Sequence, residues 1–336
     1  MAETAQPLPG PSCRDRHVGL LAFGIVQIVL GVTSFGLAAL TALSMLVFSK
    51  VAPAGSPQVT MRQVLPSLGV YVIGGAVLIW LGIGSVRCRR WARPVTLVVN
   101  WVWLLMGVMT TVMTIFVMPK TLAILPAQPS AVSDVIMTII LIFMTLFGIC
   151  LPLAFILFFR SPDVAATCAT RDPRPRWTDG IPIPLLGLVL WLASVALMAV
   201  LAIPFAILPF GATVLTGPSA VLVDLLLAAV NATLAIGLYR RSRAAWWVAL
   251  AGVAVAGAWG IWNLTRTNFA ELQRQMGLVQ SPSAPDLSFI YHSPWMVGVM
   301  VISWLGLIAF LLYVRRFLHP LTPAGTTGNP ESALSD

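Results

Sequence analysis

One acidic residue lies inside an apolar stretch of the chain and is the strongest candidate for chemistry. Asp224 follows Pro218 by six residues, so in a helix it lies about 9 Å from the helix end. Asn231, seven residues later, shares its helix face. A carboxyl group within a membrane is costly and faces the bundle interior or water. Asp224 could carry a proton or cation, or it could serve helix packing near the interface.

Three further polar side chains complete a candidate binding set. Gln27 and Asn100 are single amides in apolar runs, and such residues line a pore or make an interhelical hydrogen bond. Tyr71 takes the position of Asp224 when the two halves of the chain are aligned. We therefore expect their helices to meet, with Tyr71 close to Asp224. The candidate set is Asp224, Asn231, Tyr71, Gln27 and Asn100.

Sequence motifs of several common enzyme classes are absent. The chain has no P-loop GxxxxGK[ST], no HExxH and no GxSxG. The histidines lie in tails or at the ends of apolar runs, and the cysteines show no metal-ligand spacing. No catalytic residue, metal site or cofactor is therefore predicted. Asp163, Asp172 and Asp179 lie near arginines and are interpreted as local charge balance.

The elements that must position these side chains are long apolar segments. Hydrophobic residues make up 58% of the chain and charged residues 9%, with a mean hydropathy of +0.92, whereas soluble domains carry roughly 25% charged residues. A run of about 20 apolar residues crosses a bilayer as a helix. The predicted fold is all-α, a polytopic membrane protein with eight transmembrane helices. The expected spans are 18–48, 66–86, 94–118, 134–159, 182–210, 218–239, 244–264 and 293–314.

The basic residues predict an orientation. Most of the 20 Lys and Arg residues lie in alternate gaps between these spans, and the positive-inside rule assigns such gaps to the cytoplasm. Both termini are then cytoplasmic. The preference for Arg over Lys is typical of a GC-rich bacterial genome, so we expect a bacterial inner membrane. The residues in these gaps are Arg14, Arg16, Arg87, Arg89, Arg90, Arg93, Arg160, Arg171, Arg174, Arg176, Arg240, Arg241, Arg243, Arg315 and Arg316.

Two similar stretches indicate an internal duplication. Residues 81–91 (LGIGSVRCRRW) resemble residues 234–244 (LAIGLYRRSRA). A four-helix unit used twice keeps both copies in one orientation, as in parallel repeats. The predicted division is a tail over 1–17, a first four-helix repeat over 18–160, a linker over 161–180, a second repeat over 181–316 and a tail over 317–336.

The linker is the main candidate surface for a partner. Its segment RDPRPRWTDG contains prolines that favour extended backbone, and Thr178 or Asp179 is expected to cap the next helix. The segment could dock anionic lipid headgroups or a protein partner, or it could simply anchor the bilayer face. Because the positive charge is spread over turns, no nucleic-acid partner is expected. The candidate docking residues are Arg171, Arg174, Arg176 and Trp177.

The loop over 265–292 carries a helix-start signal. Asn268 and Glu271 resemble a capping box. A short helix that lies on the membrane surface or covers the end of the bundle is therefore predicted after Asn268.

Three classes of function fit these patterns. The first is a non-enzymatic helical bundle that acts as a scaffold, sensor or assembly partner, and the scarcity of polar groups within the spans favours it. The second is a small-solute or proton-coupled transporter or channel with its site near Asp224. The third is a membrane-embedded enzyme. Beyond the lipid bilayer, the sequence identifies no particular partner or substrate.

Overall fold

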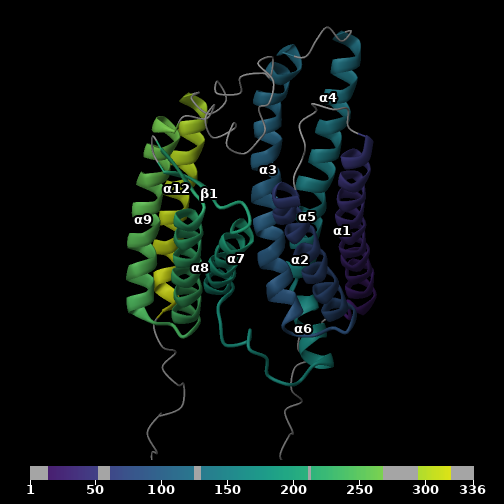
Figure 1. Ribbon diagram of the computed structural model, residues 1–336. Helices are drawn as coiled ribbons and strands as arrows, with labels where there is room; N and C mark the ends of the chain where they lie inside the picture. The colour runs from purple at the N-terminus through teal and green to yellow at the C-terminus, as the bar shows by residue number, and fades with distance from the viewer. Residues whose placement is uncertain (1–13, 52–60, 125–129, 211–212, 268–293, 319–336) are drawn as a thin grey trace, which may run out of the picture.

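The computed structural model is described for residues 14–51, 61–124, 130–210, 213–267 and 294–318 (Figure 1). Within these residues, eight helical segments are long and apolar enough to cross a membrane. The prediction of an all-α, multi-pass membrane protein is therefore confirmed. The segments are α1 (His17–Val51), α2 (Met61–Val86), α3 (Ala92–Ile124), the run of α4 (Ser130–Thr145), η1 (Leu146–Cys150) and α5 (Leu151–Arg160), α7 (Ile183–Ala202), α8 (Pro218–Tyr239), α9 (Arg243–Arg266) and α12 (Pro294–Val314).

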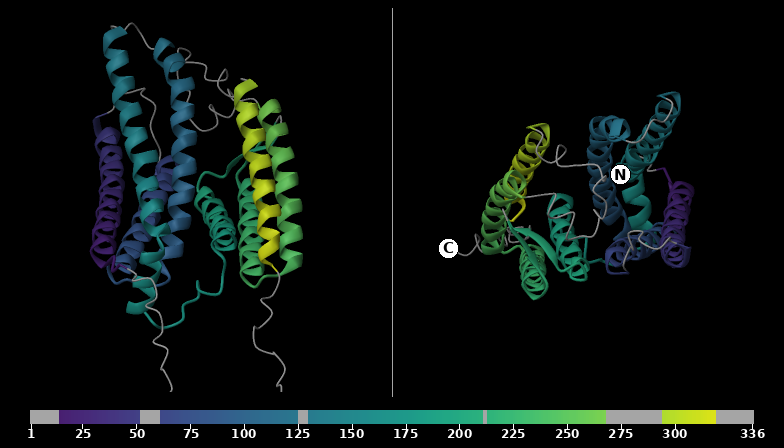
Figure 2. Two further views of the ribbon diagram at one scale, coloured as in Figure 1. Left: turned by 180° about the vertical axis from the view of Figure 1, so that it is seen from behind. Right: turned by 45° about the horizontal axis from the view of Figure 1, so that its top comes forward.

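Two groups of helices are joined by α7. Helices α1 to α5 form one group, α8, α9 and α12 form the other, and α7 lies between them (Figure 2). Leu186 of α7 belongs to a buried cluster with Val95 and Val98 of α3. Leu188 on the same helix belongs to a second cluster with Leu238 of α8. Apolar burial thus ties α7 to both groups.

Glycines bring α1 and α2 into backbone contact. Gly24 faces Gly82, and Gly31 faces Gly75, so the two helices run antiparallel. A Cβ atom built on Gly82 would lie 2.7 Å from the carbonyl oxygen of Gly24, and one on Gly75 would lie 2.9 Å from that of Gly31. Only a residue without a side chain permits this approach.

The fourth span contains a π-turn. In η1, the amide of Leu151 bonds the carbonyl of Leu146, five residues earlier. Pro152 follows, and proline has no N–H to continue a regular helical ladder. Gly107 of α3 packs directly on the backbone of Gly148 within this turn. The buried residues after the turn are Pro152, Phe155, Ile156 and Phe159.

The fifth span is shorter than predicted. The expectation of a helix over 182–210 is wrong beyond residue 202, where α7 ends. Pro204 lacks the N–H that the next helical hydrogen bond requires. The chain instead makes tight turns as far as Ala206, which has a φ of 46°.

A β-hairpin replaces the missing end of that span. Strand β1 (Ile207–Phe210) pairs antiparallel with β2 (Thr213–Thr216), and Ile207 lies opposite Thr216. The amide of Gly217 donates to the carbonyl of Ala206 and closes the base of the hairpin. The ring of Phe210 lies 4.6 Å from that of Trp259 in α9. The hairpin therefore packs on the second helix group.

The linker contains a helix that the sequence analysis did not predict. Helix α6 (Pro162–Arg171) follows the N-cap residue Ser161. Proline at the first helical position and Asp163 in the first turn are both favourable helix starts. The expected cap of α7 is also wrong, because Pro182 takes that position rather than Thr178 or Asp179. The helix predicted after Asn268 lies outside the described residues.

The expected pairing of α2 with α8 is replaced by other contacts. Helix α2 packs principally on α1, and α8 packs principally on α7. The glycine face of α2 is therefore covered by α1. The buried face of α8, which includes Ala220, Asp224 and Ala228, is covered largely by α7.

Candidate functional site

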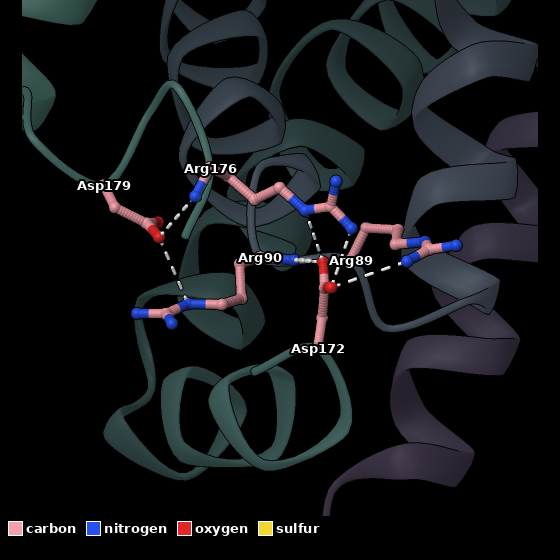
Figure 3. A network of polar contacts seen from close by, with 5 residues as sticks. All are labelled: Arg89, Arg90, Asp172, Arg176 and Asp179. Carbon is pink, nitrogen blue, oxygen red and sulfur yellow. Dashed lines mark hydrogen bonds and ion pairs between the residues drawn. The ribbon is translucent and has the colours of Figure 1, made fainter. Parts of the chain in front are cut away.

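Two aspartates and three arginines form a network where the linker meets the first helix group (Figure 3). The ends of α2, α5, α8 and α12 lie together at the lower end of the molecule in Figure 1, and we term this end the arginine-rich face. The network joins the turn between α2 and α3 to the linker after α6. We term these five residues the linker network: Arg89, Arg90, Asp172, Arg176 and Asp179.

Asp172 is the centre of the linker network. It is 3% exposed. Its carboxylate accepts two hydrogen bonds from the Arg176 guanidinium, at 2.9 and 2.8 Å. It also accepts one from Arg89 at 3.4 Å and one from the backbone amide of Arg90 at 3.3 Å. The hydrogen bonds from Arg176, helped by the Arg90 amide and the charge of Arg89, lower the pKa of Asp172 to about 2.

Asp179 forms the outer part of the same network. It accepts a hydrogen bond of 2.9 Å from the backbone amide of Arg176 and pairs with the Arg90 guanidinium at 3.4 Å. Arg90 therefore contacts one aspartate through its backbone and the other through its side chain. The segment 172–179 is thus held to the turn between α2 and α3 at both ends.

Further polar contacts hold α6 and the linker to neighbouring elements. Arg16, just before α1, pairs with Asp163 of α6 at 3.4 Å. Asp15 pairs with Arg171 at 3.0 Å. The hydrogen bond from the backbone amide of His17 lowers the pKa of Asp15, and the hydrogen bond from Arg171 lowers it further. On the other side of the molecule, Arg241 donates to the carbonyl of Gly180. The linker therefore contacts both helix groups.

The predicted docking residues divide into two kinds. Arg171 and Arg176 are engaged by aspartates. The side chains of Arg174 and Trp177 are exposed, Trp177 by 43%. The linker thus offers one cation and one aromatic ring on a segment that its neighbours hold in place.

Inside the membrane span, the structure brings together two of the five predicted binding residues. Gln27 is buried between α2 and α3, where it accepts a hydrogen bond of 3.1 Å from Ser85 and donates one of 3.4 Å to Thr96. Asn100 donates to the Thr96 carbonyl at 2.8 Å. Its Oδ1 atom is buried and has no partner among the described residues. These contacts tie three helices together and fit the structural interpretation of the amides.

The other predicted residues do not converge on one site. Asp224 is 5% exposed and makes no hydrogen bond or ion pair with the described residues. Asn231 donates to the Leu227 carbonyl of its own helix at 2.8 Å. Tyr71 is exposed, and its carbonyl accepts a hydrogen bond from Ser34. Tyr71 therefore belongs to the α1–α2 pair, and Asp224 to the α7–α8 pair.

The thiols near the arginine-rich face are buried. Cys88 and Cys168 lie in a cluster with Phe155 and Phe159. Burial, together with the neighbouring Cys88, raises the pKa of Cys168 to about 12, so this thiol stays protonated and unreactive at neutral pH. In the described part of the chain, no three His, Cys, Asp or Glu residues are grouped so that they could hold a metal ion.

The two acids of the linker network were recognisable in the sequence as lying near arginines, but their particular partners were not predicted. Asp172 and Arg176 are four residues apart, a spacing that was visible in the sequence. Arg89 and Arg90 are distant in the chain and are brought to Asp172 only by the packing of α6. Comparison with known proteins adds no functional assignment, because no family model, curated protein or solved structure matches this chain.

Proposed function

We propose that the protein is a non-enzymatic membrane bundle that acts as an assembly partner, with Arg174 and Trp177 as its contact surface for another protein. The observation that supports this is the exposure of both side chains on a segment held by the linker network. Trp and Arg are the residue types that most often dominate binding energy at protein interfaces. A segment that is already ordered loses little freedom when it binds.

Site-specific cross-linking in native membranes tests this proposal. A photo-reactive amino acid replaces Trp177 or Arg174 in the full-length protein. We expect one discrete cross-linked protein species from each position. The exposed Thr170 on α6 is the control position and is expected to give none. Products that contain only lipid, or no product at positions 174 and 177, would overturn the proposal.

The second candidate function is a small-solute or proton-coupled transporter around Asp224. The observation that favours it is the burial of this carboxyl group without a polar partner among the described residues. Such groups mark ion and proton pathways in membrane proteins. Under the first proposal, Asp224 instead lies in a sealed contact between α7 and α8.

Thiol labelling separates these two functions. Asp224→Cys and Asn231→Cys are made with the native cysteines replaced and are treated in intact cells with a membrane-impermeant reagent. Rapid labelling at both positions indicates a water-filled path along α8 and favours transport. No labelling at position 231, with slow or absent labelling at position 224, indicates a sealed bundle and favours the assembly function.

We also propose that the arginine-rich face is cytoplasmic, in a bacterial inner membrane. The clustering of arginines at one end of the bundle supports this through the positive-inside rule. Cysteines placed at Arg174 and at Thr213 in the hairpin lie at opposite ends of α7. The impermeant reagent should label position 213 in intact cells and position 174 only after the cells are opened, and the reverse pattern would overturn the orientation.

A further inference from the structure

A second group of basic and aromatic side chains surrounds a pocket of about 180 Å³. It opens at the arginine-rich face, between the start of α9 and the end of α12. Typical pockets for drug-sized molecules measure about 300–1,000 Å³, so this one suits a smaller chemical group. None of its residues belongs to the linker network. The lining residues are Arg243, Trp246, Trp247, Arg315 and Leu318.

The aromatic wall of the pocket is firmly positioned. Trp246 is buried, and its indole Nε1 donates a hydrogen bond of 2.9 Å to the carbonyl of Leu311. Trp247 packs against it with ring centroids 4.8 Å apart. The guanidinium carbon of Arg315 lies 5.5 Å from the Trp246 ring and 5.6 Å from the Trp247 ring. Cation–π contacts therefore hold Arg315 at the pocket.

Among the described residues, the lining of the pocket carries positive charge and no carboxylate. Arg315 makes no side-chain hydrogen bond with the described residues. Stacking uses the face of a guanidinium group and leaves its in-plane N–H donors available. Arg243 begins α9, whose positive dipole end adds to the charge. Two guanidinium groups beside one small cavity suit a phosphate group, which offers several charged acceptor oxygens.

The pocket also lies at the level of lipid headgroups. Arg243 begins one apolar span, and Arg315 lies in the last turn of another. Trp247, which lines the pocket, is 56% exposed, and Leu312 in the last two turns of α12 is exposed as well. Tryptophan at a span end is typical of the membrane interface. We propose that this pocket binds the phosphate group of an anionic phospholipid headgroup.

Native mass spectrometry of the full-length protein with phosphatidylglycerol tests the proposal. Each lost charge-assisted hydrogen bond is worth about 1.5–3 kcal/mol, so Arg243→Gln and Arg315→Gln should each weaken retention of the lipid about tenfold or more. Arg316→Gln is the matched control, because Arg316 is the next residue, carries the same charge and stacks on Tyr313 outside the pocket. Equal retention by all variants would overturn the proposal.

Competition identifies the source of the phosphate group. If glycerol phosphate or inorganic phosphate fails to displace phosphatidylglycerol, the lipid is the ligand, as proposed. If either soluble anion displaces the lipid in the wild type at millimolar concentration, the lipid assignment is overturned in favour of a soluble phosphate. Because Arg315→Gln removes the stacking on tryptophan, Arg243→Gln, which preserves it, keeps the test valid should the first variant fail to fold.

Discussion

Cys88 and Arg241 adopt the same left-handed backbone conformation, with φ values of 49° and 57°, in the turns that follow α2 and α8. Each amide donates to the carbonyl three residues earlier, at 3.0 and 2.9 Å. The next amide in each turn donates to the carbonyl of a glycine, Gly84 or Gly237, at 2.8 and 2.9 Å. Both are Schellman turns. They coincide at the shift of 153 residues that aligns residues 81–91 with 234–244, while the duplication itself stays a prediction.

The glycines of these two turns should respond alike to substitution. A Cβ atom on Gly84 would lie 2.9 Å from that of Ala92, and one on Gly237 would lie 2.6 Å from that of Ala245. We expect Gly84→Ala and Gly237→Ala each to lower the unfolding free energy by about 1–3 kcal/mol. Thermal unfolding in detergent measures this. Gly252, which has no neighbour within 4 Å of a built Cβ, is the control and should tolerate alanine.

The α1–α2 pair should depend on its glycines in a position-specific way. Gly82→Ala places a methyl group against the carbonyl of Gly24, so we expect a loss of about 1–3 kcal/mol in unfolding free energy. Gly74 lies two turns earlier in the same helix and has open space around it. Gly74→Ala should be neutral or stabilising, because alanine has the higher helix propensity. Equal effects in detergent unfolding would contradict the packing described above.

Asp172→Asn should loosen the linker. The amide cannot replace the carboxylate that accepts two bonds from Arg176, and each such charged hydrogen bond contributes about 1.5–3 kcal/mol. We expect faster trypsin cleavage of the bond between Arg176 and Trp177, read by mass spectrometry. Arg174 is followed by Pro175, and trypsin cleaves poorly before proline, so cleavage at Arg174 does not contribute to the measured rate. Asp15→Asn, which removes an exposed pair, should change this rate little.

The carboxylate of Asp172 also predicts how the stability of the protein changes at acid pH. Its folded pKa of about 2 lies below the ordinary value of 3.8, so the folded state favours the ionised form. The stabilisation is therefore fully present above about pH 4 and is lost as the pH falls toward 2. Thermal unfolding measured between pH 5 and pH 2.5 should show a shallower decline for Asp172→Asn than for the wild type. Parallel curves would show that Asp172 is not held as described.

Replacing the two buried amides, Gln27 and Asn100, should have different effects on the unfolding free energy. Gln27→Leu leaves Ser85 and Thr96 without their partner, and we expect it to cost about 1–2 kcal/mol of unfolding free energy. Asn100→Leu removes a buried oxygen that has no partner among the described residues. Among the described residues, the Asn100 side chain makes one hydrogen bond, from its Nδ2 to a carbonyl of its own helix, so this change should be neutral or stabilising. Detergent unfolding of both variants provides the comparison.

The spans were predictable because continuous apolar length is a strong and local signal. The end of α7 was not, because Pro204 stops the helix within a run that is still apolar. Helix pairing was less predictable. The stripe of Gly75 and Gly82 was visible, but apolar sequence alone does not select between α1 and α8 as the helix that covers it.

The candidate site was predictable only in part. Residues 171–177 were identified as a surface, and Arg174 and Trp177 are exposed there. The burial of Asp172 was missed, because it depends on α6 and on a turn more than 80 residues earlier. Long-range ion pairs leave no periodic pattern in a sequence, whereas helix faces do.

The π-turn in the fourth span means that its two parts follow different helical phases. Closing a turn through Leu146 and Leu151 accommodates one residue more than an α-helix would. Deleting a single residue from 146–150 would therefore restore a regular α-helix and keep the later residues in their present phase, whereas inserting one residue after 151 would rotate everything after it by about 100°. Phe155 and Phe159, now packed with Leu20, would keep this contact after the deletion and would lose it after the insertion. The helical phase of this span is thus set at η1, and a one-residue deletion there should be tolerated better than a one-residue insertion in α5.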